Sequence, residues 1–107
     1  MRGIKFRAWD KRTTEIIEWE YIKLNSEPFC WDDEDYTLMQ YTGAEDKNSV
    51  EIYEDDLVEN ENGVIGKVIF YNFGYCLDYG LFKVSISRLK SNELKIAGNI
   101  YENKELI

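Results

Sequence analysis

The chain has 107 residues, of which 44% are hydrophobic, and it carries a formal net charge of −8 with no histidine. This size and apolar content predict one domain, spanning residues 1–107, with a single hydrophobic core. The lack of histidine excludes Ser-His-Asp and Cys-His nucleophile arrangements and histidine-ligated metal centres, and the acidity argues against direct binding to nucleic acid.

The cellular compartment is predicted from segments that the sequence lacks. No apolar run approaches the roughly 18 residues that span a bilayer, and the N-terminal residues lack the apolar stretch of a signal peptide. Cys30 and Cys76 are expected to be reduced thiols, because cytosolic disulfides are rare and the two cysteines form no C-x-x-C pair. We therefore expect a cytoplasmic protein with no membrane partner.

The first third of the chain predicts strands through its alternating pattern. Apolar side chains alternate over residues 4–9, which indicates a half-buried strand, and residues 10–14 are turn-like. Residues 15–24, EIIEWEYIKL, fit either a strand or one face of a helix. We predict a strand paired with the first, because β-branched and aromatic residues dominate and no helix start signal precedes them. Residues 25–35 are expected to form an exposed connection.

The rest of the chain indicates short strands separated by turns. Residues 36–41 form a strand that the turn residues 42–49 end, and one helical turn is an option near residues 54–57. Asn62-Gly63 is a strong hairpin signal, since a type I′ turn needs positive φ at both positions. Further strands are expected at residues 64–71, 75–80, 81–86 and 94–101.

About six to eight short strands in a chain of this length are typical of a small antiparallel barrel or a twisted sandwich. We predict a mainly β fold of this kind with little helix, an SH3-like barrel being one form of it. The same pattern predicts these core residues: Ile4, Phe6, Ala8, Leu57, Val68, Phe70, Ile96 and Ile100.

The charge is concentrated in the middle of the chain. Residues 30–62 hold 12 acids and one base, a balance of −11, whereas residues 1–29 and 63–107 have balances of +1 and +2. Clustering acids costs self-repulsion, so this acidic segment is either a solvated face without a partner or a binding surface.

Three stretches carry a family resemblance. They are IKFRAWD at residues 4–10, LMQYTGAEDKNSVEIYEDDLV at residues 38–58 and AGNIYENKEL at residues 97–106. In order and wording they resemble the sequence blocks of the YopX family of phage and prophage proteins. The resemblance implies a mainly β, YopX-like domain of phage origin, acting in the bacterial cytoplasm, and it brings no catalytic residues.

The resemblance also singles out two positions in the central block. In the family this block usually has glycine where this chain has Ser49 and Asp55. If the family turns use positive φ there, this chain must adopt left-handed backbone without glycine, which aspartate tolerates better than serine.

Carboxylates are the abundant chemistry of the chain. The acids of WDDEDY lack the spacing of a calcium loop. Glu54, Asp55, Asp56 and Glu59 could hold Mg²⁺ for nuclease-type chemistry only if the strands brought their oxygens within about 4 Å. We predict no catalytic residue, no metal and no cofactor. Asp56 also has a structural alternative, because an aspartate at a tight bend can accept backbone N–H groups.

As a binding surface, the acidic segment suggests three functions. In the first, its carboxylates imitate a phosphate backbone and inhibit a host nuclease or a CRISPR effector with a basic groove. In the second, the protein is a phage adaptor or structural module with aromatic anchors. The third is a carboxylate-metal enzyme. The candidate binding residues are Trp31, Asp32, Asp33, Glu34, Asp35, Tyr36, Glu54, Asp55, Asp56 and Glu59.

Overall fold

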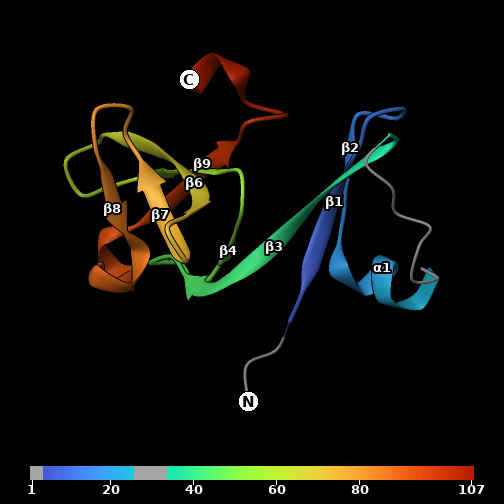
Figure 1. The fold of residues 1–107 in the computed structure, drawn as a ribbon, viewed down its shortest axis with the longest axis horizontal. Coiled ribbons are helices and arrows are strands. Elements are labelled where there is room, and N and C mark those ends of the chain that lie inside the picture. Colours follow the sequence, from blue (N-terminus) through green and yellow to red (C-terminus); the bar gives the residue numbers. More distant parts are fainter. Residues whose placement is uncertain (1–3, 26–33) are drawn as a thin grey trace. The chain divides into compact units, whose positions relative to one another are not determined.

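The computed structural model describes residues 4–25 and 34–107, and the chain divides into two compact units (Figure 1). Unit 1 is Met1–Tyr41 and unit 2 is Thr42–Ile107. Both are built from antiparallel strands with little helix, which confirms the predicted mainly β fold. That residues 1–107 form a single domain stays a prediction.

Unit 1 is organised around the strand β1 (Phe6–Asp10). This strand pairs antiparallel with β2 (Glu15–Ile17) on one side and with β3 (Tyr36–Glu45) on the other. Ala8 and Met39 are fully buried. The alternating pattern of residues 4–9 therefore predicted the strand, but of its predicted inner face only Ala8 is buried, while Phe6 is half-buried and Ile4 is exposed.

The segment that follows β2 was predicted wrongly. Residues 15–24 were expected to form one strand, but the strand ends at Ile17 and a helix, α1 (Trp19–Asn25), follows. The backbone carbonyl of Glu18 accepts the N–H groups of Tyr21 and Ile22, both at 3.1 Å, and starts the helix. Glutamate is not a favoured N-cap residue, so the sequence held no start signal.

Unit 2 contains a five-stranded antiparallel sheet in the order β8-β7-β6-β5-β9, and β4 lies beside the end of β3. The strand bounds are β4 Glu51–Tyr53, β5 Asp56–Glu59, β6 Ile65–Tyr71, β7 Gly74–Asp78, β8 Lys83–Ser85 and β9 Lys95–Asn99. Three single turns of 3₁₀-helix follow β8 and β9: η1 Ile86–Arg88, η2 Ser91–Glu93 and η3 Lys104–Leu106.

The strands of unit 2 curl around one hydrophobic core (Figure 1). Ala44, Tyr75, Tyr79, Leu89 and Ile96 pack against its margin. The buried members of this core come from strands and 3₁₀ turns across the unit: Ile52, Val58, Val68, Leu77, Ile86 and Leu94.

The core prediction was correct at the strand centres and wrong at the ends. Ala8, Leu57 and Val68 are fully buried, whereas Ile4 and Phe70 are exposed. Phe70 shares the face of Val68, but the β6–β7 hairpin continues past the core, so this face is uncovered there. A period of two gives the face of a strand and not the length over which that face is covered. The remaining predicted core residues are half-buried: Phe6, Ile96 and Ile100.

The β5–β6 hairpin confirms the predicted tip but not the turn type. Gly63 has φ of 81°, whereas Asn62 is not among the residues with positive φ, so the turn is not type I′. Instead the carbonyl of Asn60 accepts the N–H of Gly63 at 3.0 Å. The Asn60 side chain also accepts the N–H groups of Asn62 and Val64, which makes a longer loop stable.

Two other boundaries in unit 2 differ from the prediction. The strand β3 continues to Glu45 instead of ending near residue 41, and its turn begins at Asp46. Residues 54–57 form no helical turn, because a two-residue turn at Glu54 and Asp55 leads directly into β5.

Candidate functional site

The acidic segment begins in unit 1, just before β3. Three of the predicted binding residues lie outside the part of the chain that the structure describes: Trp31, Asp32 and Asp33. Glu34 is exposed, and Asp35 and Tyr36 are half-buried. The Arg12 guanidinium donates a hydrogen bond to the Tyr36 hydroxyl and lies 5.2 Å from the ring centroid. Tyr36 is thus engaged within its own unit, which weakens its case as an aromatic anchor.

In unit 2, Asp46 is buried and holds a turn to a distant strand. Its carboxylate accepts the backbone N–H groups of Asn48 at 2.8 Å and Val50 at 3.0 Å, and that of Ile96 at 3.0 Å. Burial by itself raises the pKa of Asp46, but the bonds from Ile96, Val50 and Asn48 outweigh it and lower the pKa below its ordinary value. The Asp46 carboxylate is a structural group.

The carboxylates of Asp55 and Asp56 are also used inside the fold. Asp56 is buried and accepts the backbone N–H of Tyr53 at 2.8 Å, which confirms the structural alternative for this residue. The Asp56 carboxylate is therefore turned into the fold, and its role in binding a partner stays a prediction. Asp55 accepts the hydroxyl of Tyr101 at 2.7 Å, and its carbonyl accepts the N–H of Ile100 at 3.0 Å.

The segment that reaches Asp55 is shaped by two asparagines. The Asn99 side chain accepts the N–H groups of Tyr101 and Glu102, and the Asn103 side chain accepts the N–H of Asn99. Gly98, with φ of 156°, permits this turn, because a Cβ atom there would lie 2.3 Å from Asn103 Oδ1. The turn fixes Tyr101 against Asp55.

The acids that remain at the surface of unit 2 are mostly glutamates. Glu45 and Glu61 are exposed, and Glu54 and Glu59 are half-buried. Over residues 4–25 and 34–107, no group of three or more potential metal ligands comes together. The cluster of Glu54, Asp55, Asp56 and Glu59 considered for Mg²⁺ is accordingly not assembled, since two of its members bind other groups in the fold.

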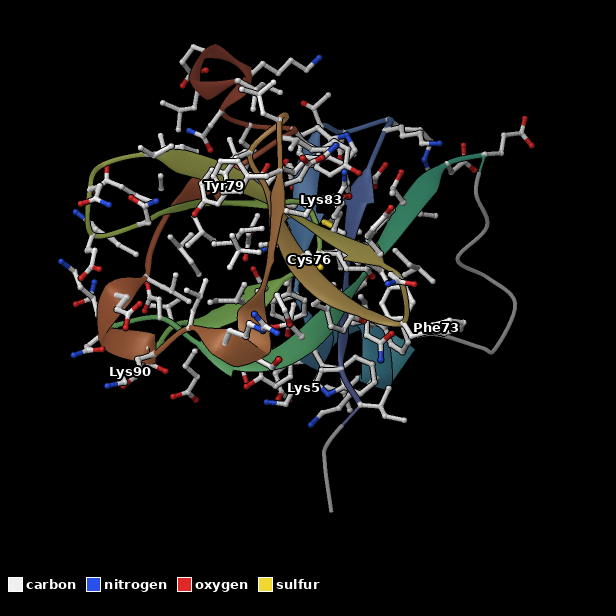
Figure 2. The ribbon with its side chains drawn as sticks, turned by 60° about the vertical axis from the view of Figure 1, so that its left-hand side comes forward. Lys5, Phe73, Cys76, Tyr79, Lys83 and Lys90 are labelled. Atoms are coloured by element: carbon white, nitrogen blue, oxygen red, sulfur yellow. The ribbon has the colours of Figure 1, made fainter. Side chains whose placement is uncertain are left out.

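Sequence reasoning missed an exposed aromatic tip on the β6–β7 hairpin. Phe73 is 96% exposed, and Phe70 and Tyr71 are also exposed. Asn72 and Phe73 have φ of 53° and 67°, a left-handed backbone that is rare for a bulky side chain. Figure 2 shows Phe73 at the end of the hairpin. The sequence did contain a signal for this tip, because a phenylalanine between the turn-forming residues Asn72 and Gly74 indicates an aromatic side chain at an exposed turn.

Comparison with known proteins decides the family. The sequence family described as YopX protein matches residues 25–107, which include the central and C-terminal blocks. The chain belongs to the YopX family. The block IKFRAWD lies before the matched region, and no curated protein matches the chain significantly.

Two crystal structures of similar proteins support the fold. Protein EF1440 from Enterococcus faecalis is 25% identical with a TM-score of 0.74, and the similarity covers 99% of each chain. Protein yopX from Bacillus subtilis is 14% identical with a TM-score of 0.62, covering 96% of this chain and 97% of that one. Within the described residues, no helix is long and apolar enough to cross a membrane.

The structure gives a physical meaning to the two family blocks in unit 2. Asp55 of the central block binds Ile100 and Tyr101 of the C-terminal block. Asp46 of the central block binds the N–H of Ile96, the residue just before the C-terminal block. These two acids of the YopX-like central block therefore bind β9 and the segment that follows it. Because these acids have structural roles, they are not by themselves evidence for a binding surface.

Ser49 and Asp55 confirm the expectation drawn from the family glycines. Their φ values are 63° and 68°, so both adopt the left-handed backbone that glycine takes without strain.

We expect Ser49→Gly to raise the free energy of unfolding by about 0.5 to 1 kcal/mol, because Ser49 is exposed and its strain is relieved. Urea denaturation checks this. Asp55→Gly should gain less, since it loses the bond to Tyr101, and a destabilised Ser49→Gly variant would contradict the strain argument.

Proposed function

We propose that this YopX-family protein acts by binding a protein partner through carboxylates of residues 30–62 and catalyses no reaction itself. The proposed partner carries a basic nucleic-acid-binding groove, as a host defence nuclease or a CRISPR effector does. The carboxylates would occupy that groove in place of phosphates. The proposal includes a phage or prophage origin and action in the cytoplasm of the bacterial host.

The observation that carries the proposal is that several acids of residues 30–62 remain at the surface, although others are buried in hydrogen bonds within the fold. Asp46 and Asp56 are buried, whereas Glu45 and Glu61 are exposed. Glu59 is half-buried at the end of β5, two residues before Glu61. These glutamates are held on strands and a short hairpin, which fixes charge at defined positions as an imitation of a phosphate backbone requires.

Charge reversal at the surface acids tests the proposal. Partners are first identified by affinity capture from a bacterial lysate and mass spectrometry. We expect paired Glu→Lys changes among Glu45, Glu59 and Glu61 to slow association with the partner by about tenfold at low salt, because steering depends on complementary charge. Binding kinetics at several salt concentrations measure this effect.

The matched controls are Glu15→Lys and Glu105→Lys, two exposed acids outside residues 30–62. They should leave association almost unchanged, and thermal unfolding of every variant checks that the fold is retained. A partner whose affinity survives both the reversals and high salt would refute the charge-based function.

The exposed aromatic tip favours a second candidate, an adaptor that binds through apolar anchors. Phe73 is almost fully exposed in a strained turn, and strained backbone is often retained at functional sites. In that case Phe73→Ala should weaken partner binding while salt has little effect, because apolar anchors are not screened. Binding would therefore weaken with salt in the first function and stay nearly constant in the second.

A further inference from the structure

Unit 2 contains a pocket at the opposite end of β7 from the aromatic tip. Its volume is about 200 Å³, and it lies between the β5–β6 loop, the β7–β8 turn and η2. Leu94, which belongs to the core, lines its apolar side. Small-molecule sites usually measure roughly 300 to 1,000 Å³, so this pocket suits a single amino-acid side chain.

An aromatic pair forms one wall of the pocket. Tyr79 and Phe82 stack with ring centroids 5.1 Å apart and an interplanar angle of 30°. The β7–β8 turn brings them together, since the Tyr79 N–H bonds the Phe82 carbonyl at 3.0 Å and Gly80 has φ of 90°. Phe82 remains 58% exposed, so an aromatic surface is open to a ligand.

The Tyr79 ring is placed by its neighbours. A Cβ atom at Gly66 would lie 3.0 Å from Tyr79 Cε1, so a larger residue there would push the ring away from β6 by a few tenths of an ångström. The Asn60 side-chain amide donates to the Tyr79 hydroxyl at 3.3 Å. Figure 2 shows Tyr79 directed over the β5–β6 arm of the sheet. The Tyr79 side of the wall is therefore held in place by contacts within the fold.

Two acidic residues also line the pocket. Glu61 comes from the β5–β6 loop and is exposed, and Glu93 comes from η2 and is half-buried. Among the residues that the structure describes, neither carboxylate forms an ion pair with a lysine or arginine of this chain. Aromatic faces beside carboxylates attract cations, because the ring quadrupole and the negative charge act together.

We propose that this pocket binds the guanidinium group of an arginine side chain presented by the protein partner. A guanidinium is planar, so it can lie against Phe82 while its N–H groups donate to Glu61 and Glu93. A lysine ammonium has no plane to stack and offers fewer donors. This inference rests on the proposed function and assigns one contact of the partner's basic surface to a defined pocket.

Short peptides test the pocket directly. The probe is acetyl-Gly-Arg-Gly-amide, added to ¹⁵N-labelled protein and followed by chemical-shift changes. We expect saturable binding with a Kd near 1 mM, with shifts confined to residues around Tyr79, Phe82 and Glu93. The same peptide with citrulline, which is nearly the same shape but uncharged, should bind at least about tenfold more weakly.

Variants assign the binding to the pocket residues. We expect the double variant Glu61→Gln, Glu93→Gln to lower the affinity for the arginine peptide by about tenfold. Phe82→Ala should lower it by about two- to fivefold. The matched controls are Glu105→Gln, another exposed acid, and Tyr21→Ala, another exposed aromatic, and neither should change the affinity. Phe82 is largely exposed, so its loss should leave the fold intact.

The inference is overturned if the arginine peptide gives no saturable shifts. It is also overturned if the citrulline peptide, or the same peptide with lysine in place of arginine, binds as tightly as the arginine peptide. Failure of the pocket is distinct from failure of the proposed function. If a partner binds in a salt-sensitive way and its affinity is unchanged by the Glu61→Gln and Glu93→Gln changes, the pocket is refuted and the proposed function is retained. An arginine peptide that binds, with no salt-sensitive partner found, supports the pocket and refutes the function.

Discussion

Replacing Leu77 with alanine should lower the free energy of unfolding by about 3 to 5 kcal/mol, the largest effect of any single truncation that we expect. Leu77 is fully buried in β7, one residue before its end. It pairs with Val68 of β6 and with Val84 of β8, so the cavity left by alanine would have rigid strands on both sides. Because a domain has a total stability of about 5 to 15 kcal/mol, much of it would be lost. Urea denaturation followed by far-ultraviolet circular dichroism measures the change.

Phe70→Ala is the matched control for the Leu77 variant. Phe70 is a larger side chain in the neighbouring strand, but it is 57% exposed and its ring meets Tyr75 edge-on at 5.1 Å. Losing that contact should cost no more than about 1.5 kcal/mol. If Phe70→Ala proved as costly as Leu77→Ala, the β6–β7 hairpin would not end beyond the core as described.

The second large effect is expected at Asp46. We expect Asp46→Ala to cost about 3 to 4 kcal/mol, because three backbone N–H groups lose a charged acceptor. Asp46→Asn should cost less, about 2 kcal/mol, since its amide oxygen can still accept from Asn48 and Val50 while its NH₂ group faces the N–H of Ile96. Glu45→Gln, at the exposed neighbouring residue, is the control and should be nearly neutral.

The pH dependence of the Asp46 effect has a definite sign. The pKa of Asp46 is lowered in the folded state, so at acid pH the unfolded state binds the proton more readily. The stability that the carboxylate contributes is therefore complete at neutral pH and is lost as pH falls through the lowered pKa, below about 4. The stability difference between wild type and Asp46→Asn should shrink over that range. A difference that grows on acidification would contradict the hydrogen-bond assignment.

The strands could be predicted from sequence because a half-buried strand repeats every two residues. Residues 64–71 and 94–101 show this pattern, and β6 and β9 lie within them. The helix α1 could not be predicted from the pattern, because Ile17, Trp19 and Tyr21 alternate as in a strand whereas Ile17, Tyr21 and Leu24 share one helical face. Glu18 also begins the helix with a backbone carbonyl and not with a capping side chain. Boundaries such as the end of β3 depend on pairing partners elsewhere in the chain.

The candidate site was predictable in charge but not in geometry. The sequence shows twelve acids in residues 30–62, yet whether each is displayed or buried is decided by contacts far along the chain. Asp46 is bound to a residue 50 positions away, and Asp55 to one 46 positions away. The aromatic wall made by Tyr79 and Phe82 was missed for a related reason. Their stacking depends on a turn and on the space left by Gly66 in another strand.

The division into two units has a spectroscopic consequence. All three tryptophans of the chain, at positions 9, 19 and 31, belong to residues 1–41, whereas residues 42–107 contain none. Indole fluorescence therefore observes unit 1 alone, while circular dichroism observes the strands of both units. The native sequence thus carries its own selective probe, and unfolding curves from the two signals would coincide only if one cooperative transition joined the units.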